Sequence, residues 1–358
     1  MKKLLLVATW LILLSLIIGA IGCGGEEATP TPTKQPTATP TITPTPTPEP
    51  IVLKLSHGYT ENSINGQTAI KIKELTEQYT DGRVQVELFH NATLFTEMEQ
   101  VQAASTGMVD IIQAQDWVLQ YAGQMDWLIT YLPFWWDGWE HYRPFIEHPD
   151  GGVKMRKNME EVLNVKALAT SPSCIWSLVI TNSKELESFY DLDGIKMRSV
   201  SGIMGVVYEQ VGGATMLTMN TAEAFTAYEM GTLDAMATAT GSAVSMKSYE
   251  TSEYAFLMRA MTASGNTICM NMDKWNSLPS DIQDIFTSKI MPDLVDWAFE
   301  FTTQEELSYL DILRKNMTTH TITDEERIKV REELWPLADK YLSMIDPDLL
   351  ALAESLRP

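Results

Sequence analysis

Hydrophobic and polar positions follow two runs along the chain, each of which mixes strand-like and helix-like patterns. In the first run, residues 51–56 are rich in apolar and β-branched side chains, and residues 83–89 alternate with a period of two. A third strand is predicted at residues 109–113. Apolar positions at helical spacing predict helices over residues 67–79 and 98–105. The predicted order is therefore β-α-β-α-β.

The second run repeats this mixture in about the C-terminal half of the chain. Strands are predicted at residues 165–169, 177–181, 194–198 and 267–271 and just after residue 233, and helices at 203–210, 223–230, 281–309 and 324–342. Pro292 and Pro336 are expected to kink or break the last two helical regions. Such alternation is typical of parallel or mixed sheets covered by helices. The sequence thus predicts an α/β fold of two lobes, with a ligand cleft near the carboxyl ends of the strands.

The first 22 residues are predicted to be a signal peptide. Lys2 and Lys3 precede an uncharged, mainly apolar stretch over residues 4–21, which is long enough that a transmembrane anchor is the alternative interpretation. Residues 20–23 resemble the bacterial lipobox, in which the cysteine receives the lipid, although that pattern favours Leu where this chain has Ala20. Cys23 is therefore the predicted lipidation site, and several acyl chains on it would make a stable membrane anchor.

Residues 23–50 are predicted to be a tether behind the lipidated cysteine. Eight of the chain's 17 prolines lie between residues 29 and 50, and most of the other residues there are threonines. Proline fixes φ and lacks an N–H donor, so such a tract extends as polyproline II and does not pack. The folded part is expected to begin at residue 51.

Composition narrows the classes of function. The chain is 45% hydrophobic and 20% charged, as expected for a protein with a packed core. Its formal charge of -21 repels phosphate backbones, so nucleic acid is not an expected partner. The five histidines show no metal-ligand spacing, and no nucleophile elbow or phosphate-binding loop is present in the sequence. We therefore expect no enzyme activity, no bound metal and no cofactor.

Two further groups of residues leave alternatives open. Cys174 and Cys269 lie 95 residues apart and form either two buried free thiols or a disulfide. The segment from Trp117 to Trp139 contains five of the ten tryptophans. Core packing explains most of them, and one or two could line a pocket.

Arg198 is the charged residue that the pattern singles out. It follows an apolar strand and precedes a predicted helix, at the end where ligands meet α/β sheets. A guanidinium in that place can hold a carboxylate through two parallel hydrogen bonds. The alternative is a surface arginine paired with a nearby acid.

An ordered series of short segments resembles the substrate-binding subunit of TRAP (tripartite ATP-independent periplasmic) transporters, the dicarboxylate-binding P type. The matching segments, spread over about residues 51–345, are 53–57, 80–89, 107–110, 132–134, 181–183, 191–198, 222–227, 231–234 and 275–283. The resemblance implies an extracytoplasmic protein, on the periplasmic side if an outer membrane is present. Such a protein captures a small organic acid and delivers it to a permease driven by an ion gradient.

The resemblance also implies a division of the chain into lobes. It places residues 51–174 and 264–303 in lobe I and residues 175–263 and 304–358 in lobe II, within a periplasmic-binding-protein-like fold whose lobes are joined by hinge strands. The neighbourhoods of Cys174 and Cys269 would belong to those hinge strands. A disulfide between them would then pin the hinge, if the two residues lie side by side.

The resemblance assigns site residues as well. Arg198 falls on the family's selectivity arginine, which binds the substrate carboxylate. By matching position, three polar residues are expected to face the cleft and two aromatic residues to form its walls: Gln115, Ser201, Thr238, Trp117 and Trp176.

Two departures from the family pattern bear on the substrate. A second arginine of many relatives is replaced here by residues 176–178 (Trp-Ser-Leu), and a polar stretch after Asp234 is replaced by residues 235–240 (Ala-Met-Ala-Thr-Ala-Thr). A second substrate carboxylate would then be left unpaired. We therefore expect a monocarboxylate with an apolar or hydroxylated body.

Three other interpretations share some of these features. The binding lipoprotein of an ATP-driven importer and a ligand-sensing receptor subunit would have the same tether and the same two-lobed shape. A secreted lipoprotein enzyme would need a catalytic constellation, which the motifs do not supply.

Overall fold

The computed structural model describes residues 49–199, 202–219 and 221–358. The predicted signal peptide (residues 1–22), Cys23, almost all of the tether and Ser201 lie outside these described residues. Residues Pro48–Pro358 form one compact unit, which we call the folded unit. Among the described residues, no helix combines the length and the apolar character needed to cross a bilayer.

The described strands form a single mixed sheet. Their order is β2-β1-β3-β8-β4-β7-β5-β6, and β9 pairs with β8 beside this path. The strands are β1 (Ile51–Ser56), β2 (Val84–Phe89), β3 (Ile111–Gln115), β4 (Val165–Thr181), β5 (Lys196–Ser199), β6 (Thr215–Thr218), β7 (Ala235–Ala239), β8 (Tyr254–Asn271) and β9 (Thr318–Thr321). The predicted α/β class is therefore confirmed.

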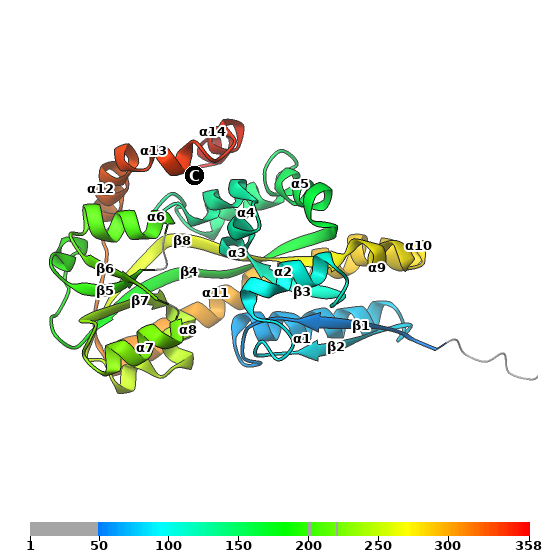
Figure 1. Ribbon diagram of the computed structural model, residues 1–358, viewed down its shortest axis with the longest axis horizontal. Coiled ribbons are helices and arrows are strands. Elements are labelled where there is room, and N and C mark those ends of the chain that lie inside the picture. The colour runs from blue at the N-terminus through cyan, green and yellow to red at the C-terminus, as the bar shows by residue number, and fades with distance from the viewer. Residues whose placement is uncertain (1–48, 200–201, 220) are drawn as a thin grey trace, which may run out of the picture. The chain divides into compact units, whose positions relative to one another are not determined.

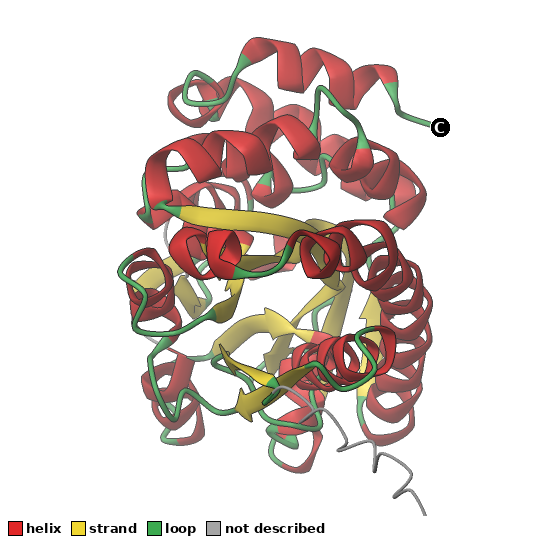
Figure 2. Cartoon of the chain, turned by 90° about the vertical axis from the view of Figure 1, so that its right-hand side faces the viewer, coloured by secondary structure: helices red, strands yellow, loops and turns green. Residues whose placement is uncertain are grey.

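Helices cover this sheet on its faces, as Figures 1 and 2 show. They are α1 (Ile64–Tyr79), α2 (Glu97–Ser105), α3 (Asp116–Tyr121), α4 (Trp139–Glu147), α5 (Gly152–Leu163), α6 (Gly202–Val206), α7 (Thr221–Glu229), α8 (Thr240–Ser245), α9 (Met272–Ser277), α10 (Ser280–Ile285), α11 (Met291–Asn316), α12 (Asp324–Leu334), α13 (Asp339–Leu342) and α14 (Pro347–Ser355). Pro292 lies in the first turn of α11, directly after a π-helical turn (Phe286–Ile290) that joins α10 to α11 without a break, whereas Pro336 lies in the short turn that follows the end of α12.

Two long antiparallel strands join the two halves of the sheet. β1, β2 and β3 run parallel to one another on one side, and β5, β6 and β7 run parallel on the other. β4 and β8 pair along most of their length and pass through both halves (Figure 1). The sequence predicted two separate strands within β4, which is in fact one strand of 17 residues.

Buried apolar side chains form three clusters, two of which are each confined to one half of the sheet while the largest spans both. One cluster packs α1 and the start of α11 on the β1–β3 half, and includes Ile72 and Leu294. Another packs the end of α11 on the β5–β7 half, and includes Leu310 and Leu313. The largest contains most of the aromatic segment predicted to be core, including the fully buried Trp136. α11 therefore contributes to the core of both halves.

The two remaining cysteines are free thiols and do not lie side by side. Cys174 is paired in register with Ser264, whereas Cys269 is paired with Ala167. Five residues of strand separate the two positions, which is roughly 17 Å and more than twice the reach of a disulfide. The hypothesis of a disulfide across the hinge is therefore wrong.

Candidate functional site

The pairing of β4 with β8 is interrupted between the two halves of the sheet. Pro172, Cys174 and Trp176 pair with Gly265, Ser264 and Arg259 respectively, with a register shift on each side of Cys174. Four residues of β8, 260–263, consequently lie opposite one residue of β4. We call residues 172–176 and 259–265 the junction. Bulges of this kind bend a strand and re-aim its side chains.

The junction lies where strand ends from both halves meet. β1 and β3 are parallel, and β3 ends at Gln115, which pairs with Asn266 next to the junction. On the other side, β5 and β7 are parallel, and β7 ends at Ala239, which pairs with Ser177. Carboxyl ends of parallel strands are the usual location of ligands in α/β sheets. This edge is therefore the candidate functional site.

Arg198 occupies the end of β5 on this edge. The strand ends one residue later, and α6 begins at Gly202. The side chain is only 9% exposed, and its Nε donates a hydrogen bond of 3.1 Å to the carbonyl of Met219. Burial lowers the pKa of the guanidinium, because desolvation disfavours its charged form. A desolvated guanidinium binds a carboxylate more strongly than an exposed one does.

Gln115 and Trp117 lie together in the opposite half. The indole N–H of Trp117 donates a hydrogen bond to Oε1 of Gln115. Nε2 of Gln115 lies 3.5 Å from Oγ of Ser173, which belongs to the junction. Both residues are therefore tied to β4 at the point where its pairing is interrupted.

Trp176 and Thr238 lie on neighbouring strands of the other half. Trp176 is part of the junction and partly exposed, and Thr238 pairs with Leu178 two residues further along β4. The carbonyl of Trp176 accepts a hydrogen bond of 3.4 Å from the hydroxyl of Thr240, the first residue of α8. The structure therefore places five predicted site residues at the junction or near the strand ends that face it from the two halves: Arg198, Gln115, Trp117, Trp176 and Thr238.

Several polar residues near the junction were not predicted from the sequence. Tyr131 contributes a hydroxyl 3.3 Å from that of Ser264, and Tyr59 and Glu97 interact electrostatically with Tyr131. Burial raises the pKa of Tyr59, Tyr131, Glu97 and Cys174. Burial therefore favours the protonated form of each of these four groups.

Asp116 follows Gln115 directly and is fully buried. Its Oδ2 accepts hydrogen bonds from the backbone N–H of Gly265 at 2.9 Å and from the hydroxyl of Tyr142 at 3.4 Å. Burial raises the pKa of Asp116 to about 8, against the effect of these hydrogen bonds. Asp116 thus holds β8 at the junction as a carboxyl group that is largely protonated at neutral pH.

Glu306 accepts hydrogen bonds from the backbone of β4, as Asp116 does from the backbone of β8. Its Oε1 accepts hydrogen bonds from the backbone N–H groups of Ile175 at 2.7 Å and of Trp176 at 3.0 Å. The side chain is 2% exposed, and burial raises its pKa to about 7. The sequence contains one indication that Glu306 is buried. Glu306 lies at helical spacing between Thr302 and Leu310, which are buried on the same face of α11.

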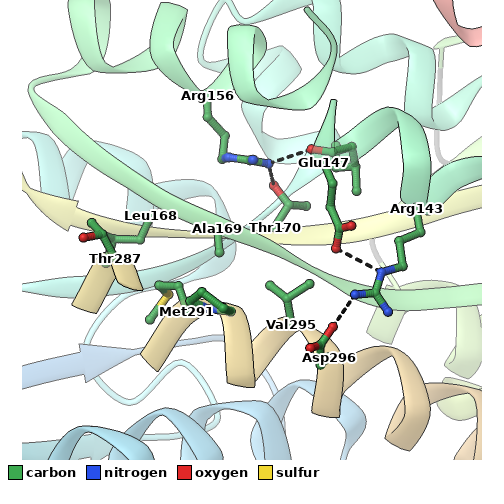
Figure 3. A pocket seen from close by; sticks show the side chains of 12 residues that line it. Arg143, Glu147, Arg156, Leu168, Ala169, Thr170, Thr287, Met291, Val295 and Asp296 are labelled. Carbon is green, nitrogen blue, oxygen red and sulfur yellow. Dashed lines mark hydrogen bonds and ion pairs between the residues drawn. The ribbon is translucent and has the colours of Figure 1, made fainter. Parts of the chain in front are cut away.

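A separate cavity of about 380 Å³ borders β4 before the junction. Figure 3 shows Arg156 donating to the carbonyl of Ile146 and to the hydroxyl of Thr170, while Arg143 lies between Glu147 and Asp296. None of the predicted site residues lines this cavity. It is therefore distinct from the edge that carries Arg198.

Comparison with known proteins gives a consistent family. The family model described as "Bacterial extracellular solute-binding protein, family 7" matches residues 55–344. Among curated proteins, the chain is 25% identical to the C4-dicarboxylate-binding periplasmic protein of Rhodobacter capsulatus, over 85% of this chain and 90% of that protein. It is 21% identical to the sialic acid-binding periplasmic protein of Vibrio cholerae, over 84% and 91% of the two chains.

Solved structures share the fold. A TRAP periplasmic solute-binding protein from Shewanella oneidensis with bound succinate superposes with a TM-score of 0.75 at 19% identity, covering 86% of this chain and all of that one. The sugar acid-binding protein of Advenella mimigardefordensis in complex with galactonate gives a TM-score of 0.76 at 19% identity, covering 86% and 99%. The two halves described above therefore correspond to the lobes of this fold.

Proposed function

Because this chain belongs to family 7 of the bacterial extracellular solute-binding proteins, we propose that it captures a small carboxylate between its two lobes and delivers it to a TRAP permease. The observation that carries the proposal is the buried guanidinium of Arg198 at the end of β5. A guanidinium at the end of a strand can hold a carboxylate through two parallel hydrogen bonds, and ligands of α/β sheets bind at such strand ends. Arg198 would bind a substrate carboxylate in this way.

The proposed substrate class is a monocarboxylate with hydroxyl groups or a compact apolar body. Arg198 would bind the carboxylate from one lobe. In the other lobe the residues beside the junction are Gln115, Trp117 and Tyr131, which offer hydrogen bonds and aromatic surface but no positive charge. A second carboxylate on that side would find no positive charge among these three residues. Hydroxyl groups, in contrast, would be matched by these donors and acceptors.

Thermal stabilisation of the folded unit by carboxylates tests this assignment. D-galactonate represents hydroxylated monocarboxylates, and succinate represents dicarboxylates. A ligand at 100 times its dissociation constant stabilises the folded state by about 2.7 kcal/mol, which is a shift of several degrees at this size. We expect Arg198→Ala to abolish the shift and Arg198→Lys to reduce it, because lysine keeps the charge without the paired donors.

The control is Arg83→Ala, since Arg83 is an exposed arginine that pairs with Asp281 far from the junction. The control should respond to ligand as the wild type does. Equal stabilisation of the wild type and Arg198→Ala by the same carboxylate would refute the role of Arg198.

We also propose that the mature protein is a lipoprotein anchored through Cys23, with residues 23–50 as its tether. The proline-rich composition of the tether supports the proposal, because such a segment would hold the folded unit away from the bilayer. Mass spectrometry of the N-terminal peptide should show acyl chains on Cys23. Cys23→Ala should move the protein from the membrane fraction to the soluble fraction, and retention of that variant in the membrane fraction would favour the uncleaved anchor.

A further inference from the structure

The junction leaves backbone groups of β4 without partners in the sheet. Apart from a register shift between Ala167 and Ala169, antiparallel pairing with β8 covers residues 165–172 and 176–181 of β4. Ile175, in contrast, lies opposite four residues of β8, an excess of three. Buried N–H groups require an acceptor, because each one left unsatisfied costs about 1–3 kcal/mol. Glu306 supplies that acceptor for Ile175 and for Trp176 through a single carboxylate oxygen.

The other strand of the junction has its own partners. The backbone N–H of Phe134 donates to the carbonyl of Met261 at 3.2 Å, and Asp116 accepts from the N–H of Gly265. Ala260, the first of the four residues of β8 opposite Ile175, adopts a left-handed conformation with φ of 57°. The two strands are therefore secured separately, and Glu306 is the group that secures β4.

α11 holds Glu306 in place from both lobes. Leu294 near the start of this helix packs in the cluster of one half, and Leu310 and Leu313 near its end pack in the cluster of the other. Glu306 lies between these anchors, fully buried. A buried carboxyl group at such a position costs free energy that an apolar residue would not, so the hydrogen bonds to β4 must offset that cost.

We propose that Glu306 is a positioning residue of the ligand site: its hydrogen bonds to Ile175 and Trp176 fix the bulged conformation of β4 that presents Trp176 to the ligand. The proposal rests on the proposed function for the identity of the ligand, since Trp176 lies on the edge that carries Arg198. This role accounts for an acid that is buried away from the solvent.

Amide hydrogen exchange of the folded unit without ligand tests whether Glu306 keeps the backbone N–H groups of β4 hydrogen-bonded at the junction. Glu306→Met keeps the volume of the side chain but removes the acceptor, and we expect the amides of Ile175 and Trp176 to exchange at least about tenfold faster. Glu306→Gln keeps an acceptor oxygen and should retain protection. Glu300→Gln is the matched control, because Glu300 is exposed on the same helix. Wild-type exchange at both amides in Glu306→Met would overturn the proposal.

A second variant keeps the test decisive if the Met variant does not fold. Glu306→Asp retains the carboxyl group but shortens the side chain by one methylene, so it should also accelerate exchange at Ile175 and Trp176. Protection equal to the wild type in Glu306→Asp would then overturn the proposal.

Calorimetric titration with D-galactonate and succinate tests the consequence for binding. We expect Glu306→Met to weaken the affinity for the bound probe about tenfold, and Glu306→Gln and Glu300→Gln to stay within about twofold of the wild type. An unchanged affinity in Glu306→Met would show that the bulge does not position the site. If the wild type binds neither probe, the proposed substrate class fails, while the exchange experiment still decides whether Glu306 holds β4.

Discussion

Replacing Glu306 by Gln should remove a specific pH dependence of stability. Burial raises the pKa of Glu306 from 4.5 to about 7. Between these two values the folded state therefore binds more protons than the unfolded state. The contribution of Glu306 to the free energy of unfolding is fully present below pH 4.5 and is lost as the pH rises toward 7. Gln cannot titrate, so the stability of Glu306→Gln should rise relative to the wild type over the same window.

The expected magnitude follows from the size of the shift. A difference of about 2.5 pKa units corresponds to about 3 kcal/mol at 1.36 kcal/mol per unit. For a folded unit of this size, about 3 kcal/mol shifts the midpoint of thermal unfolding by about 6 °C. The ionisable groups that interact with Glu306 are Cys174 and Tyr309, and Asp116 interacts in turn with Cys174. All three are present in both proteins, so their own titration largely cancels in the difference.

Chemical denaturation at several pH values between 4 and 8 measures this difference. The wild type and Glu306→Gln are compared at each pH, with Glu300→Gln as the exposed control on the same helix. We expect the gap between the two Glu306 proteins to change by about 3 kcal/mol over this range, and the control to run parallel to the wild type. Parallel profiles for all three proteins would refute the account of Glu306 as a buried carboxyl group with a raised pKa.

Three further outcomes follow from the packing. Gly66→Ala should lower the free energy of unfolding by about 2 kcal/mol or more, measured by urea denaturation, because the added Cβ would lie 2.2 Å from the carbonyl oxygen of Thr60; a neutral effect would contradict this contact. Trp136→Ala should cost about 3–5 kcal/mol in the same assay, since the indole is fully buried and its N–H donates to the carbonyl of Ile129. Thiol titration of the unreduced, denatured folded unit should find Cys174 and Cys269 free, and a count of zero would restore the disulfide.

The local pattern of apolar and polar residues predicted most of the helices and strands, but it did not predict the full length of the long strands. β1, β2 and the central helices were predicted to within a few residues because their apolar spacing matches one period throughout. β4 was predicted as two strands because Pro172 and its polar neighbours interrupt the pattern. In the structure Pro172 lies at a register shift, where a missing N–H donor is tolerated. Periodicity of apolar residues therefore failed to predict the strand at the place where the two lobes meet.

The candidate site was only partly predictable for a related reason. The end of a strand is a local feature, so the position of Arg198 near the end of β5 could be predicted from the sequence. The hydrogen bond between Glu306 and Ile175 joins residues that are 131 positions apart in the sequence. The hydrophobic pattern of either segment contains no information about this contact with the other. The only local signal was an acid within the buried stripe of α11, which indicates a buried carboxyl group but not its partner.

The location of the junction bears on how a two-lobed protein of this kind could close. Because one sheet runs through both lobes, any relative motion must bend β4 and β8. Bending them within the regular ladder would break backbone hydrogen bonds, at about 1 kcal/mol each. At the junction that ladder is already interrupted, and the backbone groups are held by Glu306 and Asp116 instead. Side-chain acceptors can follow a change in backbone angle that a strand partner cannot, so the junction is the least costly place for such a bend. Trp176, which is part of β4 at the junction, and Gln115, which contacts Ser173 of β4, are two of the residues proposed to contact the ligand. Binding of the substrate to these residues would therefore be coupled directly to that motion.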